Sequence, residues 1–164
     1  MRVYGVTGWK NTGKTGLMER LVSEITARGF SVSTLKHAHH NTDVDQPGTD
    51  SHRHRVAGAR EVLLASPHRW ALMTELRGVP EPSLAALLAR LAPVDLVLIE
   101  GYKRAPHPKV ECHRADARRA LLAPGNPTIR AVASDAVHPG LEVPLFDLDD
   151  TATIADFILA EVGL

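Results

Sequence analysis

The sequence predicts an α/β fold of three layers, a mostly parallel sheet with helices on both faces, together with one antiparallel strand pair. Residues 2–7 form a short stretch with Val3, Tyr4 and Val6, which predicts a buried strand. A glycine-bounded loop and a segment with helical periodicity follow it. Residues 31–36 follow as a second predicted strand, and such strand–helix–strand units are almost always parallel and right-handed. Residues 96–99 form a continuous apolar run, as expected for a parallel strand that is covered on both faces.

The loop after the first predicted strand has the spacing of a phosphate-binding loop. Residues 8–15, Gly-Trp-Lys-Asn-Thr-Gly-Lys-Thr, match G-x-x-x-x-G-K-[ST] at every fixed position. Backbone N–H groups and the positive end of the following helix hold phosphate in such loops, and glycine allows the required backbone. We expect the Lys14 ammonium to reach the β- and γ-phosphates and the Thr15 hydroxyl to bind Mg²⁺. The predicted nucleotide-binding residues here are Gly8, Trp9, Lys10, Asn11, Thr12, Gly13, Lys14, Thr15 and Gly16, and Lys14 is also a predicted catalytic residue.

The other helices and strands are predicted from the spacing of apolar residues and from the residues that begin and end each element. The first helix carries apolar residues at one-face spacing from Leu17 to Ile25 and ends near Gly29, a residue that favours helix C-termini. Residues 60–66 and 69–76 are predicted strands with no helix between them, which predicts an antiparallel pair. The remaining predictions are a helix after Ser83 whose leucines form a core-facing stripe, strands at residues 109–114, 128–134 and 143–148, a helix-like stretch at residues 115–127, and a C-terminal helix from Asp150 or Thr151.

Residues 37–55 are the most unusual segment, because they hold five of the nine histidines and three aspartates. The segment leaves the carboxyl end of the second predicted strand, which is the edge where ligands bind in open α/β sheets. Pro47-Gly48 marks a turn, and one of residues 49–51 is predicted to cap a short helix that runs to about residue 59.

Three interpretations of this segment are open: a polar surface loop, a transition-metal site, and a switch-like loop near the γ-phosphate. Imidazole and carboxylate suit zinc or nickel, but no two of its histidines have i, i+4 spacing, which disfavours a structural metal site. We favour the switch-like loop, in which an aspartate orients water or reaches Mg²⁺ through water and an arginine binds a second anion. The candidates are Asp43, Asp45 and Asp50, of which Asp45 and Asp50 are predicted catalytic residues, Arg53 or Arg55 for the anion, and His37, His39, His40 and Arg53 as a possible cofactor or switch loop.

The apolar run at residues 96–99 ends in Glu100, at the carboxyl end of its strand. In phosphate-loop enzymes an acid at this position completes the Mg²⁺ site opposite the loop Ser or Thr, so Thr15 and Glu100 are the predicted metal ligands. Asp95 lies about five residues, or about 16 Å, away along an extended strand, which favours a role at the start of the strand. With the loop, this acid predicts one P-loop NTPase domain over residues 1–164.

Asp135 comes directly after the predicted strand at residues 128–134, at the same edge. It could accept hydrogen bonds from N1 and N2 of guanine, which adenine cannot supply in the same way, or it could cap a turn. Both interpretations are open. Cys112 has no base and orienting group near it in the pattern, so a catalytic nucleophile is not predicted.

The amino-acid composition argues against a nucleic-acid-binding protein and a membrane protein. The apolar content is 44%, the formal net charge is zero and the pI is about 7.1, so neither a nucleic-acid partner nor a membrane surface is expected. No apolar run approaches a membrane span, and the N-terminus lacks a signal-peptide pattern. Cys112 is the single cysteine, which fits a reducing cytoplasm, so we expect a cytoplasmic location.

Four segments in order along the chain resemble the molybdopterin-guanine dinucleotide biosynthesis protein B (MobB) family. They are residues 6–15 with Lys-Asn-Thr-Gly-Lys-Thr, residues 35–59 with His-Ala-His-His and Pro-Gly-Thr-Asp-Ser, residues 96–103 with Leu-Val-Leu-Ile-Glu-Gly-Tyr-Lys, and residues 131–135 with Ala-Val-Ala-Ser-Asp. The resemblance implies that the protein binds GTP with Mg²⁺, hydrolyses it slowly and forms homodimers. It also implies that the protein assists the attachment of GMP to a molybdopterin-type intermediate, together with the guanylyltransferase partner MobA.

The sequence departs from the larger class of dimeric phosphate-loop proteins in two places. ATPases of that class often carry a lysine directly after the first loop glycine, where this chain has Trp9 and the lysine comes one residue later. The Asn-Lys-x-Asp string that reads guanine elsewhere is absent, so the GTP preference depends on the resemblance and on Asp135. Two alternatives are an ATP-dependent small-molecule kinase and a His-rich metallochaperone GTPase.

Overall fold

The computed structural model describes residues 1–38 and 43–164, and His39 and His40 of the predicted switch loop lie outside these residues. The described chain divides into two compact units. The first comprises residues 1–37 and 91–164, and the second comprises residues 38–90. Each unit is described by itself below, and a single nucleotide-binding domain over residues 1–164 stays a prediction.

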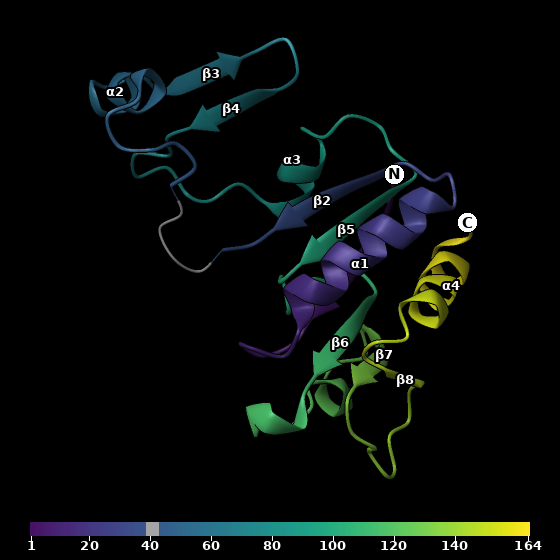
Figure 1. Ribbon diagram of the computed structural model, residues 1–164. Helices are drawn as coiled ribbons and strands as arrows, with labels where there is room; N and C mark the ends of the chain where they lie inside the picture. Colours follow the sequence, from purple (N-terminus) through teal and green to yellow (C-terminus); the bar gives the residue numbers. More distant parts are fainter. Residues whose placement is uncertain (39–42) are drawn as a thin grey trace. The chain divides into compact units, whose positions relative to one another are not determined.

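The first unit is built on a six-stranded parallel sheet with the order β2-β5-β1-β6-β7-β8 (Figure 1). Because every neighbouring pair is parallel, the carboxyl ends of all six strands meet at one edge. This confirms the predicted α/β class with a mostly parallel sheet. The elements of this unit are β1 (Arg2–Thr7), α1 (Lys14–Ala27), β2 (Val32–Lys36), β5 (Leu96–Glu100), β6 (Lys109–His113), β7 (Ile129–Ser134), β8 (Leu145–Asp147) and α4 (Thr151–Val162).

The main core lies between this sheet and the helices α1 and α4, which pack side by side (Figure 1). Leu96 and Leu98 of β5 belong to that core, whereas Val97 and Ile99 alternate with them and are also fully buried. Both faces of β5 are therefore covered, as its unbroken apolar run predicted. Among the described residues, no helix is both long and apolar enough to cross a membrane.

The segment predicted as helix-like, residues 115–127, contains no α-helix. It has only two short 3₁₀ turns, η1 (Ala115–Ala117) and η2 (Ala123–Gly125), and Arg118 between them has a left-handed φ of 48°. The reason lies in β6, whose side chains accept the backbone N–H groups that an α-helix would use internally. Glu111 is fully buried and its carboxylate accepts the N–H groups of Leu122, at 2.8 Å, and Ala123, at 2.9 Å.

The second unit contains an antiparallel hairpin and two short helices. Its elements are α2 (Asp50–Val56), β3 (Glu61–Ala65), β4 (Trp70–Thr74) and α3 (Leu84–Leu88), and β3 pairs with β4 as predicted. The backbone of Thr49 caps α2, but its hydroxyl donates to Gln46 O at 2.8 Å, and α2 ends three residues earlier than expected. Ser83 caps α3 through a 3.2 Å bond from Ala86 N, yet the leucine stripe of α3 is half-buried and not part of a closed core.

His107 supplies a test of the packing in the first unit. Its imidazole lies against the backbone of β1, since a Cβ on Gly5 would come within 2.7 Å of His107 Nε2. Both ring nitrogens are buried and, among the described residues, have no hydrogen-bond partner. Burial, with a smaller contribution from the Lys109 ammonium, lowers the pKa of His107 to about 4.

We predict that His107→Leu makes the protein more resistant to urea at pH 5 and changes its stability much less at pH 8. The native state takes up a proton on His107 less readily than the unfolded chain, so stability falls as pH drops from about 6.5 towards about 4. A leucine removes that loss, about 1 kcal/mol after allowance for solvent screening of the partly exposed ring. His68→Leu, at an exposed turn, is the control. Equal effects of the two substitutions would contradict the prediction.

Candidate functional site

The glycine-bounded loop lies between β1 and α1, at the carboxyl edge of the parallel sheet. Three of its residues have left-handed φ angles: Gly8 at 139°, Asn11 at 64° and Gly13 at 90°. A Cβ on Gly8 would lie 2.3 Å from the carbonyl oxygen of Cys112 and 2.7 Å from Thr12 Oγ1. No side chain fits there, so the first loop glycine is required by the backbone of β6 as well as by its own φ.

The Lys14 side chain folds back over its own loop and donates to the carbonyl oxygen of Trp9. The Thr12 hydroxyl donates to the same oxygen at 2.9 Å, and Thr12 is fully buried. Burial lowers the pKa of Lys14, while Cys112 and Glu100 act in the opposite direction. The ammonium is therefore held at the mouth of the loop by a neutral carbonyl, a partner that an anionic ligand can replace.

Glu100 lies at the end of β5, where its carboxylate faces two groups. Its Oε1 accepts from the Thr15 hydroxyl at 3.3 Å, and its Oε2 lies 3.3 Å from Lys36 Nζ at the end of β2. A hydroxyl and a carboxylate side by side are hard oxygen ligands of the kind that Mg²⁺ prefers, so these two residues fit a magnesium site. Asp95 stands at the other end of the strand, where it accepts from Ser31 N and Oγ, as a strand-start residue would.

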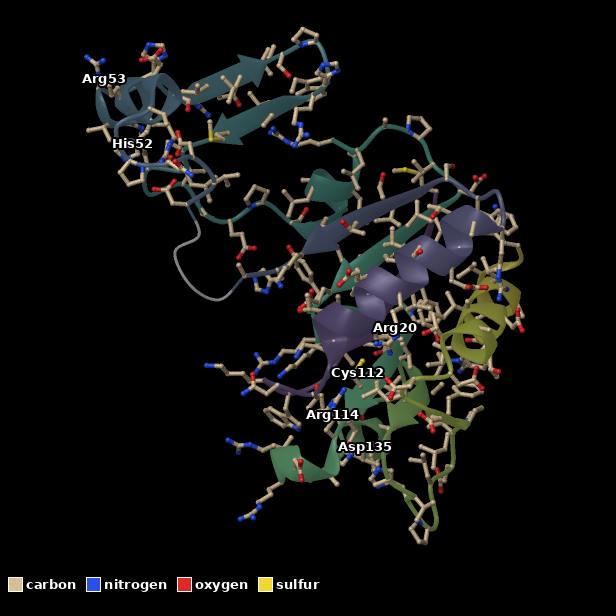
Figure 2. The ribbon with its side chains drawn as sticks, viewed as in Figure 1. Arg20, His52, Arg53, Cys112, Arg114 and Asp135 are labelled. Carbon is tan, nitrogen blue, oxygen red and sulfur yellow. The ribbon has the colours of Figure 1, made fainter. Side chains whose placement is uncertain are left out.

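Arg114 is a site residue that the sequence analysis did not find. It follows β6 directly, and its Nε would be 3.1 Å from a Cβ on Gly13. Residues 11–16 and Arg114 line a pocket of about 390 Å³. Figure 2 shows Arg114 with Cys112 and Asp135 at the carboxyl ends of β6 and β7. The available signal was a basic residue directly after a strand at the same edge as Glu100.

Asp135 is exposed, and its Oδ1 accepts the N–H of Ala115 at 2.9 Å. It thereby ties the loop after β7 to the loop after β6. Cys112 is fully buried, and burial raises the pKa of its thiol to about 12, which agrees with the expectation that it is no nucleophile.

The His-rich segment is divided between the two units. His37 belongs to the first, where its N–H donates to Glu100 O at 3.0 Å and its ring stacks on Tyr102 at 4.5 Å. Within the described residues, no cluster of histidine, cysteine and carboxylate side chains is arranged to hold a metal ion.

The other candidates of that segment lie in the second unit. Asp45 is bound by the Arg55 guanidinium, which also bonds Asp43 and, at 2.8 Å, Glu75, and this ion pairing lowers the pKa of Asp45. Asp50 and Arg53 form a loose, exposed pair at 3.9 Å on α2, where Figure 2 shows Arg53 pointing outward. Catalytic roles for Asp45 and Asp50 stay a prediction.

The chain is similar along most of its length to one group of proteins. A family model described as molybdopterin guanine dinucleotide synthesis protein B matches residues 3–135. The molybdopterin-guanine dinucleotide biosynthesis adapter protein of Haemophilus influenzae is 41% identical over 162 residues, covering 95% of this chain and 86% of that protein. The protein of the same name from Escherichia coli is 41% identical over 155 residues, covering 92% and 87%. The crystal structure of a MobB protein homolog from Bacillus stearothermophilus has a TM-score of 0.71 at 30% identity, and the match covers 99% of each chain.

We predict that Gly8→Ala lowers the affinity of the loop for pyrophosphate at least tenfold, whereas Gly125→Ala changes it less than twofold. An alanine at residue 8 would clash with the Cys112 carbonyl at a φ that L-residues rarely adopt. Gly125 ends η2, does not line the pocket at residues 11–16, and an added Cβ there would meet no atom within 4 Å. Isothermal titration calorimetry of the two folded variants measures the difference, and equal affinities would rule out this role for Gly8.

Proposed function

The chain belongs to the family of molybdopterin guanine dinucleotide synthesis protein B, and from this membership we propose that it is a GTP-binding adapter in molybdenum cofactor synthesis. In this role it binds Mg²⁺ and GTP and assists the attachment of GMP to a molybdopterin-type intermediate. Its proposed protein partner is the guanylyltransferase MobA. Weak Mg²⁺-dependent GTPase activity and a cytoplasmic location belong to the same proposal.

The observation that carries the proposal is the pairing of the loop with Glu100 at the carboxyl edge of the sheet. The Thr15 hydroxyl, in the first turn of α1, and the Glu100 carboxylate, at the end of β5, lie 3.3 Å apart, and β5 is the neighbour of the strand β1 that leads into the loop. A bound Mg²⁺ would neutralise phosphate charge and share ligands between the nucleotide and these two side chains. Lys36 supplies a further cation beside the same carboxylate.

The residues of the loop have distinct parts in this binding. Gly8 and Gly13 let the backbone N–H groups turn towards the phosphates. Lys14 exchanges its bond to the Trp9 carbonyl for phosphate oxygens, a charge-assisted bond that is stronger than the one it replaces. Arg114 adds a guanidinium at the side of Gly13 and can bind a phosphate oxygen pair in its fixed fork.

Guanine is proposed to lie over the loops that follow β6 and β7. Asp135 uses Oδ1 to hold Ala115, and we assign its Oδ2 to the N1 and N2 groups of guanine. The bond to Ala115 would keep that carboxylate in a fixed orientation, which is what discrimination between two bases requires.

The proposal includes a homodimer, and the hairpin of the second unit supports it. Leu63 and Leu72 are a cross-strand pair on one face of β3 and β4, with Trp70 on the same face. Trp70 is 69% exposed and Leu63 63%. A two-stranded hairpin with such a face gains stability when that face is covered.

We expect calorimetric titration to give tighter binding of GTP than of ATP, and GTP binding that is strengthened by Mg²⁺. Glu100→Gln should abolish the strengthening by Mg²⁺, and Lys14→Ala should weaken GTP binding by about tenfold to a hundredfold, because a charge-assisted bond to phosphate is lost. Glu19→Gln, on the exposed side of α1, is the matched control.

The relative affinity for ATP and GTP decides which nucleotide the protein uses. Preferential ATP binding would overturn the GTP assignment and favour the small-molecule kinase. Mg²⁺ dependence that persists in Glu100→Gln would remove Glu100 from the metal site and leave the nucleotide assignment standing.

A further inference from the structure

The indole of Trp9 holds two cationic side chains next to the phosphate loop. Lys103 Nζ lies 4.2 Å from the ring centroid, and the Arg119 guanidinium carbon lies 5.7 Å from it. Cation–π attraction of this kind positions a cation without neutralising its charge. Among the described residues, neither cation has a carboxylate partner in an ion pair.

The segment that carries Arg119 is fixed from several sides, although it has no regular secondary structure. Trp9 Nε1 donates to Ala120 O at 2.8 Å. The buried His113 ring bonds Arg119 O at 3.0 Å and Ser134 Oγ at 3.1 Å. Since Arg119 O can only accept, His113 Nε2 carries the proton in that bond. The backbone of Arg119 is therefore held in place, and its guanidinium is presented from a fixed base.

A pocket of about 440 Å³ lies between this segment and the loop, lined by Trp9, Lys10, Asn11, Asp116, Ala117 and Arg119. Lys10 is a third cation without an ion-pair partner among the described residues, and Asp116 is the acid among the lining side chains. The pocket shares only Asn11 with the pocket at residues 11–16, so it is a separate hollow that adjoins the phosphate site.

We propose that this second pocket binds the phosphomonoester of the acceptor molecule to which the nucleotide is joined. The inference rests on the proposed function, because a dinucleotide forms only when an acceptor phosphate meets a nucleotide phosphate. A lysine and an arginine held on an indole suit a phosphomonoester, whose two charges a point cation and a planar fork bind together. Trp9 is thus a positioning residue, Arg119 contacts the ligand from the wall of the pocket, and Lys103 adds its positive charge from the Trp9 ring, outside the lining of the pocket.

Isothermal titration calorimetry with neopterin monophosphate tests the proposal, with neopterin as the probe that lacks the phosphate. The titrations use wild type, the double variant Lys103→Gln/Arg119→Gln, and the control Arg104→Gln/Arg118→Gln. The control removes the same charge from exposed neighbouring residues. We expect the first double variant to bind neopterin monophosphate at least tenfold more weakly than the control, since the charge-assisted contact of Arg119 and the neighbouring positive charge of Lys103 are lost.

A second readout reports the site directly. Trp70→Phe leaves Trp9 as the single tryptophan, because the chain has two. We expect neopterin monophosphate to change the Trp9 emission of this variant, because it binds beside the indole and draws the Arg119 guanidinium off the ring. The same titration with saturating GTP present is expected to give the same affinity within twofold.

Three results would overturn the proposal. They are equal binding of neopterin monophosphate by both double variants, binding of neopterin as tight as that of its phosphate, and competitive displacement by GTP or pyrophosphate. The proposed function fails by a different result, namely that wild type binds no GTP. In that case the titrations of nucleotide-free protein with neopterin monophosphate still measure whether the second pocket binds a phosphomonoester.

Discussion

The contact between Gly8 and the Cys112 carbonyl is the constraint on which the rest of the site depends. It brings the turn of the loop against the end of β6, at a distance that admits no side chain. Because β6 neighbours β1 in the sheet, this contact also puts Arg114, two residues farther on, beside Gly13. The opposite neighbour, β5, delivers Glu100 to Thr15. One backbone approach thus fixes the phosphate loop between a basic and an acidic side chain.

Much of this arrangement was predictable from sequence, because it depends on local patterns. The loop spacing and the apolar run before Glu100 are signals that survive without any tertiary information. Distance along an extended strand was enough to separate Glu100 from Asp95, and the structure puts Asp95 on Ser31 at the other end. The order of the strands in the sheet was not predictable in this way, because the apolar pattern of a parallel strand does not indicate which strands lie beside it.

Two errors of the sequence analysis, the helix expected at residues 115–127 and the missed Arg114, have a common physical origin in β6. Its alternation of polar and apolar residues predicted a strand, but the polar residues Lys109, Glu111 and His113 are all buried. Lys109 donates to Ala105 O, His107 O and Thr128 Oγ1, each at 2.7 Å, and burial lowers its pKa to about 8. Glu111 and His113 bond backbone groups of residues 119–123, and these bonds replace internal hydrogen bonds of the helix that residues 115–127 were expected to form. Such long-range partners leave no trace in a local window, and Arg114 was missed for the same reason.

The position of Lys36 has a thermodynamic consequence. Its ammonium and a divalent cation at Thr15 and Glu100 would both draw on the same carboxylate, so occupancy by one weakens the hold of the other. The backbone carbonyl of Glu100 is bonded to His37 N, and the Tyr102 ring stacks on His37. Glu100 therefore faces the proposed metal position with its carboxylate and holds the segment after β2 with its backbone carbonyl. A cation bound there would compete with Lys36 for the side chain of the residue whose backbone anchors the start of the His-rich segment.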